Sequence, residues 1–136
     1  MSKVMATIKC FEDIESWKKA RTVCKKLGVL IEEGRLKKSY RLINQIEGSS
    51  GSIMDNIAEG FERGTRAEFI QFLGYAKGSC GELRSQLYRT FDRNYIIQQE
   101  FEDLKASSMQ ISGLIQNLIN YLQKSEIAGV RKKNTA

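Results

Sequence analysis

The stretch from Thr65 to Phe91, TRAEFIQFLGYAKGSCGELRSQLYRTF, decides the fold class of this chain. It opens with the spacing of a capping box, in which Thr65 accepts a hydrogen bond from a first-turn amide and Glu68 reaches back. Apolar residues then recur every three or four positions, which is the period of a helix with one buried side. This apolar side consists of Phe69, Phe72, Leu73, Ala76, Cys80, Leu83, Leu87 and Phe91. The pattern predicts a long amphipathic helix that ends near Asn94.

The segments on both sides of this stretch contain helical patterns as well. Upstream, a helix is predicted from near Glu12 to near Glu33, with Gly34 as its stop. Its inner residues are Ile14, Trp17, Ala20, Cys24, Leu27 and Ile31. Downstream, a helix is predicted from about Gln98 to about Lys124. Its inner residues are Phe101, Leu104, Ile111, Leu114, Ile115, Leu118 and Leu122.

One more helix is predicted from Leu36 or Ser39 to about Gly60. Its centre, Gly48–Ser52, consists of glycine and serine and allows a break into two short helices. We favour one unbroken helix, because the isoleucines keep the helical phase across the centre and small residues let a neighbouring backbone approach closely. Its inner residues are Ile43, Ile46, Ser50, Ile53 and Ile57, flanked by Leu42, Met54 and Phe61.

These patterns predict an all-α fold, an antiparallel up-down-up-down four-helix bundle. The 136 residues suit one domain, and the complete absence of proline favours long helices. Short connections make neighbouring helices antiparallel. A three-helix variant with a broken second helix is the alternative. We expect an N-terminal tail over 1–10, the bundle over 11–124 and a basic, disordered tail over 125–136.

Composition narrows the function classes. No apolar run approaches the roughly 20 residues that span a bilayer, and the N-terminal residues do not resemble a signal peptide, so we expect a cytoplasmic protein without a membrane partner. The chain has no histidine, the commonest general base and metal ligand. Its three cysteines are irregularly spaced, which favours small buried side chains over disulfides or metal ligands. We expect no enzyme activity, no metal, no cofactor and no small-molecule substrate.

The positive charge is concentrated in one region. Between Glu15 and Arg41, nine basic residues face only three acidic ones, and this excess equals the net charge of +6 of the whole chain. The basic residues are Lys18, Lys19, Arg21, Lys25, Lys26, Arg35, Lys37, Lys38 and Arg41. An unpaired positive surface attracts phosphate polymers without reading their sequence. The alternative is a lysine-rich surface that only keeps the protein soluble.

A polar motif, Asn56-Ile57-Ala58-Glu59-Gly60, closes the second predicted helix. Asn56 and Glu59 are expected on one side of that helix, and Gly60 is a candidate left-handed stop. In the third helix, Glu82 and Gln86 similarly lie near small residues. We interpret Asn56, Glu59, Gly60, Glu82 and Gln86 as a structural polar motif that fixes helix register or lines a subunit contact. The alternative is a carboxylate site of a hydrolase.

Several strings in this order resemble the family of 23S rRNA-intervening-sequence proteins, which is related to the accessory variability protein of diversity-generating retroelements. Asn56–Gly60 corresponds to the N-I-A-E-G motif of that family. The other corresponding strings are Phe11–Ile14, Trp17–Ala20, Leu42 with Gln45-Ile46, Ser52-Ile53, Glu68-Phe69, Phe72-Leu73, Gly78-Ser79, Glu82-Leu83 and Gln86-Leu87. The resemblance covers about residues 11–122. The chain departs from the family in the connections Glu33–Leu36 and Asp92–Tyr95.

The resemblance implies a homopentamer of four-helix protomers without known catalytic activity. Together with the charge distribution, it suggests a scaffold that binds RNA or a nucleoprotein through the basic residues. The alternative is an accessory factor that binds a protein, for example a reverse transcriptase, without direct contact with nucleic acid.

Overall fold

The computed structural model describes the backbone of residues 8–135 and the side chains of residues 8–125. Within this range a short 3-10 helix, η1 (Phe11–Asp13), precedes four α-helices. The helices are α2 (Glu15–Glu32), α3 (Tyr40–Glu62), α4 (Arg66–Asp92) and α5 (Gln98–Thr135). The described residues form no β-strand, so the all-α prediction is confirmed.

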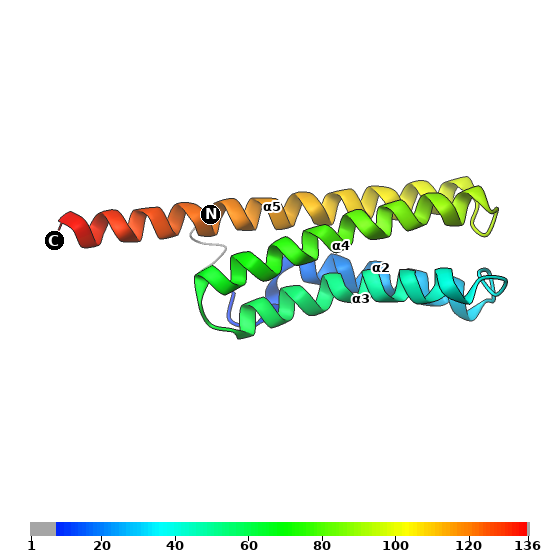
Figure 1. Ribbon diagram of the computed structural model, residues 1–136, viewed down its shortest axis with the longest axis horizontal. Coiled ribbons are helices and arrows are strands. Elements are labelled where there is room, and N and C mark those ends of the chain that lie inside the picture. The colour runs from blue at the N-terminus through cyan, green and yellow to red at the C-terminus, as the bar shows by residue number, and fades with distance from the viewer. Residues whose placement is uncertain (1–7, 136) are drawn as a thin grey trace.

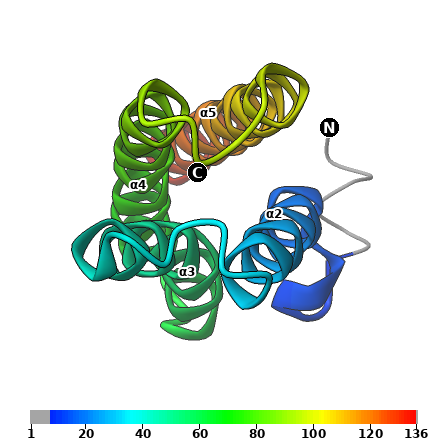
Figure 2. The ribbon, with the colours of Figure 1, turned by 90° about the vertical axis from the view of Figure 1, so that its right-hand side faces the viewer.

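The four α-helices form an antiparallel bundle. The α2–α3 and α4–α5 turns lie at one end of the bundle, and the α3–α4 turn lies at the other (Figure 1). Viewed along the bundle, the helices occupy four corners, with α2 diagonally across from α4 and α3 across from α5 (Figure 2). The contacts of α3 with α4 and of α4 with α5 are more extensive than those that α2 makes with α3 and α5. The predicted up-down-up-down architecture is confirmed.

Branched aliphatic side chains from α3, α4 and α5 fill the centre of the bundle. The exposed fraction is zero for Ile46, Ile53, Ile57, Leu73, Leu83, Leu87, Ile111 and Ile115. Burial of one such side chain contributes about 1.5–3 kcal/mol, so this cluster accounts for the main favourable term in folding.

The helix limits follow from local hydrogen bonding. At the start of α4, Thr65 Oγ1 accepts from the Glu68 amide at 3.3 Å and donates to Glu68 Oε1 at 2.9 Å. The first bond is the one that the capping box predicts. The glutamate, however, bonds to the threonine hydroxyl rather than to its amide. Gly34 stops α2 as predicted: the helix ends at Glu32, and the φ of +78° at Gly34 is a left-handed conformation that glycine adopts without strain.

Helix α3 runs unbroken through Gly48–Ser52, as favoured above. Ser50 Oγ donates to the Ile46 carbonyl at 2.7 Å. Ser49 Oγ lies 3.3 Å from the same carbonyl but has a closer acceptor at 2.6 Å, Gln86 Oε1 of α4. The helix thus avoids unsatisfied buried donors at these positions.

The buried face of α2 is rotated about the helix axis relative to the predicted face, by about one residue position. Ala20 and Leu27 are buried as expected, but Ser16, Val23 and Leu30 complete the buried stripe. Trp17, Cys24 and Ile31 are only half-buried. The indole of Trp17 instead packs edge-on against Phe11, with the ring centroids 5.1 Å apart. Hydrophobicity alone favoured the large tryptophan over a serine, whereas the packing of α2 between α3 and α5 places the serine inside.

The C-terminal expectation is also corrected. Helix α5 continues to Thr135, past the predicted end near Lys124, and the backbone of residues 125–135 is helical rather than a tail without regular structure. No proline interrupts the helical hydrogen bonds in this segment. Ala136 and residues 1–7 of the predicted N-terminal tail lie outside the described range. No helix in the described part of the chain combines the length and apolar character needed to cross a membrane.

Candidate nucleic-acid interface

The outer side of α2 carries a line of cations. Lys18, Arg21 and Lys25 are spaced by three and four residues, which places them on one side of the helix, and all three are exposed. Lys19 and Lys26, seven residues apart, follow a second line beside the first. Lys19 is half-buried and Lys26 is exposed. Because Ala20 and Leu27 bury the opposite side of α2 against the core, the first line of cations points away from the core.

Three more exposed cations follow α2: Lys37 and Lys38 lie in the α2–α3 turn, and Arg41 lies in the first turn of α3. Leu36 anchors the α2–α3 turn in the core with an exposed fraction of 2%. Ser39 then starts α3 by accepting a hydrogen bond from the Leu42 amide at 3.2 Å. The buried leucine and the serine cap therefore fix a short turn whose remaining side chains face solvent.

Two of the nine predicted cations have carboxylate partners. Lys18 Nζ lies 3.5 Å from Glu15 Oε1 in an exposed pair, which contributes little. Arg35 is bound more firmly, because its guanidinium donates to both carboxylate oxygens of Glu100, at 2.6 and 3.2 Å. The hydrogen bonds and charge of Arg35 lower the pKa of Glu100, and the carboxylate raises the pKa of Arg35. Arg35 therefore joins the two turns at one end of the bundle, and we remove it from the predicted interface.

For the other seven cations, no carboxylate of the described side chains lies within 4.0 Å. With Lys18, they form what we call the basic face: Lys18, Lys19, Arg21, Lys25, Lys26, Lys37, Lys38 and Arg41. Arg21 is partly engaged, since its guanidinium lies 5.9 Å from the centroid of the Trp17 ring.

The basic face borders a shallow groove between α2 and α5. The groove has a volume of about 290 Å³ and is lined by Lys26, Val29, Leu30, Glu100, Asp103 and Leu104. Its two carboxylates reduce the positive potential around Lys26. The least compensated part of the basic face is therefore the outer line of α2 together with the α2–α3 turn.

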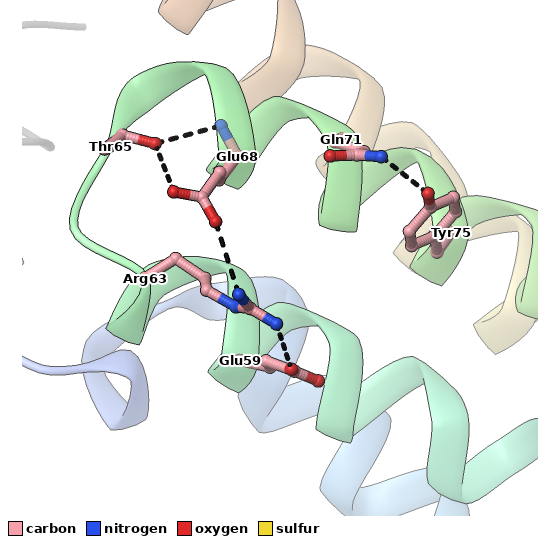
Figure 3. Close-up of polar contacts among 6 residues, drawn as sticks. All are labelled: Glu59, Arg63, Thr65, Glu68, Gln71 and Tyr75. Atoms are coloured by element: carbon pink, nitrogen blue, oxygen red, sulfur yellow. Dashed lines mark hydrogen bonds and ion pairs between the residues drawn. The ribbon is translucent and has the colours of Figure 1, made fainter.

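The predicted polar motif does not form one cluster. Asn56 donates to the carbonyl of Ser52 within its own helix at 2.8 Å. Glu59 is exposed and pairs with Arg63 at 3.0 Å, and Arg63 also reaches Glu68 at 3.5 Å (Figure 3). The motif thus ties the end of α3 to the start of α4 through Arg63.

The role predicted for Gly60 as a helix stop is wrong. Gly60 lies inside α3, where a Cβ atom would approach Phe72 Cβ to 2.6 Å, and the left-handed glycine that follows α3 is Gly64, with φ +84°. Gly60 therefore permits the close approach of α3 and α4.

The remaining two residues of the motif behave differently from each other. Glu82 is exposed, and no hydrogen bond joins it to another described residue. Gln86 is buried and accepts a 2.6 Å hydrogen bond from Ser49 Oγ across α3 and α4. This buried pair was missed, because a serine in a glycine-rich helix segment gives no sign of its partner 37 residues away. It matches the expectation that polar groups link two helices, but Asn56, Glu59 and Glu82 take no part in it.

Burial raises the pKa of the thiols of Cys24 and Cys80. Burial raises the pKa of Cys80 to about 12, so this thiol stays protonated at neutral pH. Cys24 is half-buried, and burial raises its pKa as well. No group of three or more Cys, Asp or Glu side chains within the described range is arranged to hold a metal ion.

Comparisons with known proteins agree with this fold. The profile of the family described as 23S rRNA-intervening sequence protein matches residues 12–117. A comparison with curated proteins finds no match. A crystal structure from Bacteroides thetaiotaomicron, of a protein with unknown function from the S23 ribosomal protein family, is similar, with a TM-score of 0.71 and 24% identity over 77% of this chain and 95% of that chain. At this identity the likeness shows the shared fold. The chain thus belongs to the 23S rRNA-intervening sequence protein family.

Proposed function

We propose that this protein is a non-catalytic, cytoplasmic scaffold that binds RNA, alone or within a nucleoprotein, through the basic face. One observation carries the proposal: seven cations of α2, the α2–α3 turn and the first turn of α3 have no carboxylate within 4.0 Å among the described side chains. Uncompensated cations bind phosphate polymers because binding releases the counterions condensed on the polymer.

The arrangement favours contacts with the phosphate backbone over contacts with base edges. Lys18 and Lys25 project from one helix side, and two turns of helix, about 10.5 Å, separate them. Flexible lysine side chains at this spacing can follow neighbouring phosphates, but they lack the fixed fork geometry that bidentate base contacts use. The proposal is therefore affinity for structured RNA that depends strongly on salt and weakly on sequence.

Paired charge variants test the proposal. Lys25→Gln/Lys37→Gln removes two exposed cations of the basic face, and Arg66→Gln/Lys124→Gln removes two exposed cations elsewhere. In a filter-binding titration with structured RNA at low salt, we expect the first variant to bind about tenfold more weakly than the unmodified protein. The matched control should bind as the unmodified protein does.

Equal losses in both variants would show that only net charge matters. Salt-insensitive affinity, or no affinity near physiological salt, would instead favour an acidic protein as the partner of the basic face, as in a protein-binding accessory factor.

We further propose that the protein assembles into a homo-oligomer, a pentamer by resemblance to the family. The outer side of α4 supports this proposal, since a Cβ atom added at Gly74, Gly78 or Gly81 would meet no neighbouring atom within 4 Å, which leaves space for another backbone. Light scattering should give a mass near five protomers of 15.5 kDa. A monomer mass would contradict assembly and leave RNA binding to be judged by the charge variants.

A further inference from the structure

Tyr40 is an unusual aromatic side chain in this molecule. It is 79% exposed, more than any other large hydrophobic side chain in the described range. The other exposed tyrosines are held in place: the Tyr75 ring lies 5.5 Å from Phe72, and the Tyr88 ring lies 4.9 Å from Phe101. Tyr75 also receives a hydrogen bond from Gln71 at 2.7 Å (Figure 3). Among the described side chains, Tyr40 has no aromatic, cation–π or hydrogen-bonding partner.

The surroundings of Tyr40 are basic. Lys37 and Lys38 precede it in the α2–α3 turn and Arg41 follows it, all three exposed and without a carboxylate partner among the described side chains. The first turn of α3 contains no acidic residue. The carboxylate of Glu33, the residue that follows the end of α2, lies 3.9 Å from the guanidinium of Arg35. An aromatic ring thus stands free between cations at the least compensated part of the basic face.

We propose that Tyr40 is a stacking platform for an unpaired base, so that the RNA bound by the basic face presents a single-stranded segment or loop at the α2–α3 turn. A tyrosine ring stacks on any base, while lysine and arginine hold the phosphates on either side. In a duplex the base faces are already stacked on one another, so the ring of Tyr40 finds no accessible base face there. This inference rests on the proposed function and narrows its ligand class from RNA in general to RNA with accessible bases.

The test compares two probes: an oligoadenylate of about twelve nucleotides and a fully paired RNA duplex of the same length. Tyr40→Ala should weaken oligoadenylate binding about five- to a hundredfold and leave duplex binding unchanged. Tyr40→Phe keeps the ring and should bind both probes as the unmodified protein does. Tyr75→Ala is the matched control, because its ring already has partners within the protein. A 2-aminopurine placed within the oligoadenylate should change its fluorescence on binding, and Tyr40→Ala should abolish that change.

The outcomes separate the two proposals. If Tyr40→Ala binds oligoadenylate as well as the unmodified protein does, or loses duplex binding equally, stacking is contradicted and RNA binding by the basic face stands. A loss with Tyr40→Phe equal to that with Tyr40→Ala would assign the effect to the hydroxyl group and also contradict stacking. If the unmodified protein binds neither probe near physiological salt, the proposed function itself fails. Both Tyr40 variants should melt at the temperature of the unmodified protein, since Tyr40 is 79% exposed.

Discussion

Gly60 shows how one residue determines the distance between two helices. Its side of α3 meets Phe69 and Phe72 of α4, and an added Cβ would lie 3.3 Å from the Phe69 ring and 2.6 Å from Phe72 Cβ. The latter contact involves a Cβ atom fixed to the backbone, so a rotamer change cannot relieve it. Glycine is therefore required here for packing and not for its φ angle.

Gly60→Ala should lower the free energy of unfolding by about 1–3 kcal/mol, because overpacking pushes α3 and α4 apart. Gly48→Ala is the control, at an exposed position of the same helix with no atom within 4 Å of the added Cβ. It should raise stability by about 0.5–1 kcal/mol through helix propensity. Urea unfolding of both variants checks the prediction. A neutral or stabilising effect of Gly60→Ala would contradict the close helix contact.

The Arg35–Glu100 pair gives a second prediction for a single residue, in the acid range. Arg35 lowers the pKa of Glu100 below its ordinary value of 4.5 in the folded protein. The pair therefore stabilises the fold above the unfolded-state pKa, and this contribution is lost as the pH falls through the folded-state pKa. Glu100→Gln should cost roughly 0.5–1 kcal/mol at pH near 7 and almost nothing at strongly acidic pH. Glu82→Gln, at an exposed carboxylate without a partner among the described residues, should leave the urea midpoint unchanged at both pH values.

At the scale of the helices, the sequence predicted those features that depend on neighbours in the chain. The Thr65 cap, the Gly34 stop and the phase of the isoleucines in α3 are local, and the structure confirms them. The buried position of Ser16 was missed, because it depends on how α2 rotates against α3 and α5. The apolar period predicts that α2 is a helix, but it predicts the rotation of the helix about its axis only to within about one residue position.

The Ser49–Gln86 hydrogen bond tests how α3 and α4 are aligned. Ser49→Ala leaves the buried amide oxygen of Gln86 without its donor and should cost about 1–3 kcal/mol. Combining it with Gln86→Leu removes both polar groups and should recover part of that loss. Ser85→Ala, at an exposed position of α4, is the control. Additive losses in urea unfolding would contradict a coupled pair.

At the scale of the whole molecule, the surplus of basic residues was visible in the sequence, but its pairing was not. Glu100 lies 65 residues from Arg35 and reaches it only because the α2–α3 and α4–α5 turns share one end of the bundle (Figure 1). The partners of the polar motif were not visible in the sequence either: Asn56 bonds within α3, Glu59 pairs with Arg63, and Glu82 is exposed. The sequence therefore predicted where the basic residues are concentrated, whereas the topology of the bundle determines which of them pair with a carboxylate.

The salt dependence of RNA affinity tests the basic face most directly. The logarithm of the binding constant should fall linearly with the logarithm of salt concentration, with a slope of about −0.7 to −0.9 per phosphate neutralised. Lys25→Gln/Lys37→Gln should make this slope less steep by about 1.4–1.8, and Arg66→Gln/Lys124→Gln should leave it unchanged. If both variants keep the slope of the unmodified protein, the cations of α2 and its following turn do not contact phosphates, and the proposed function is contradicted.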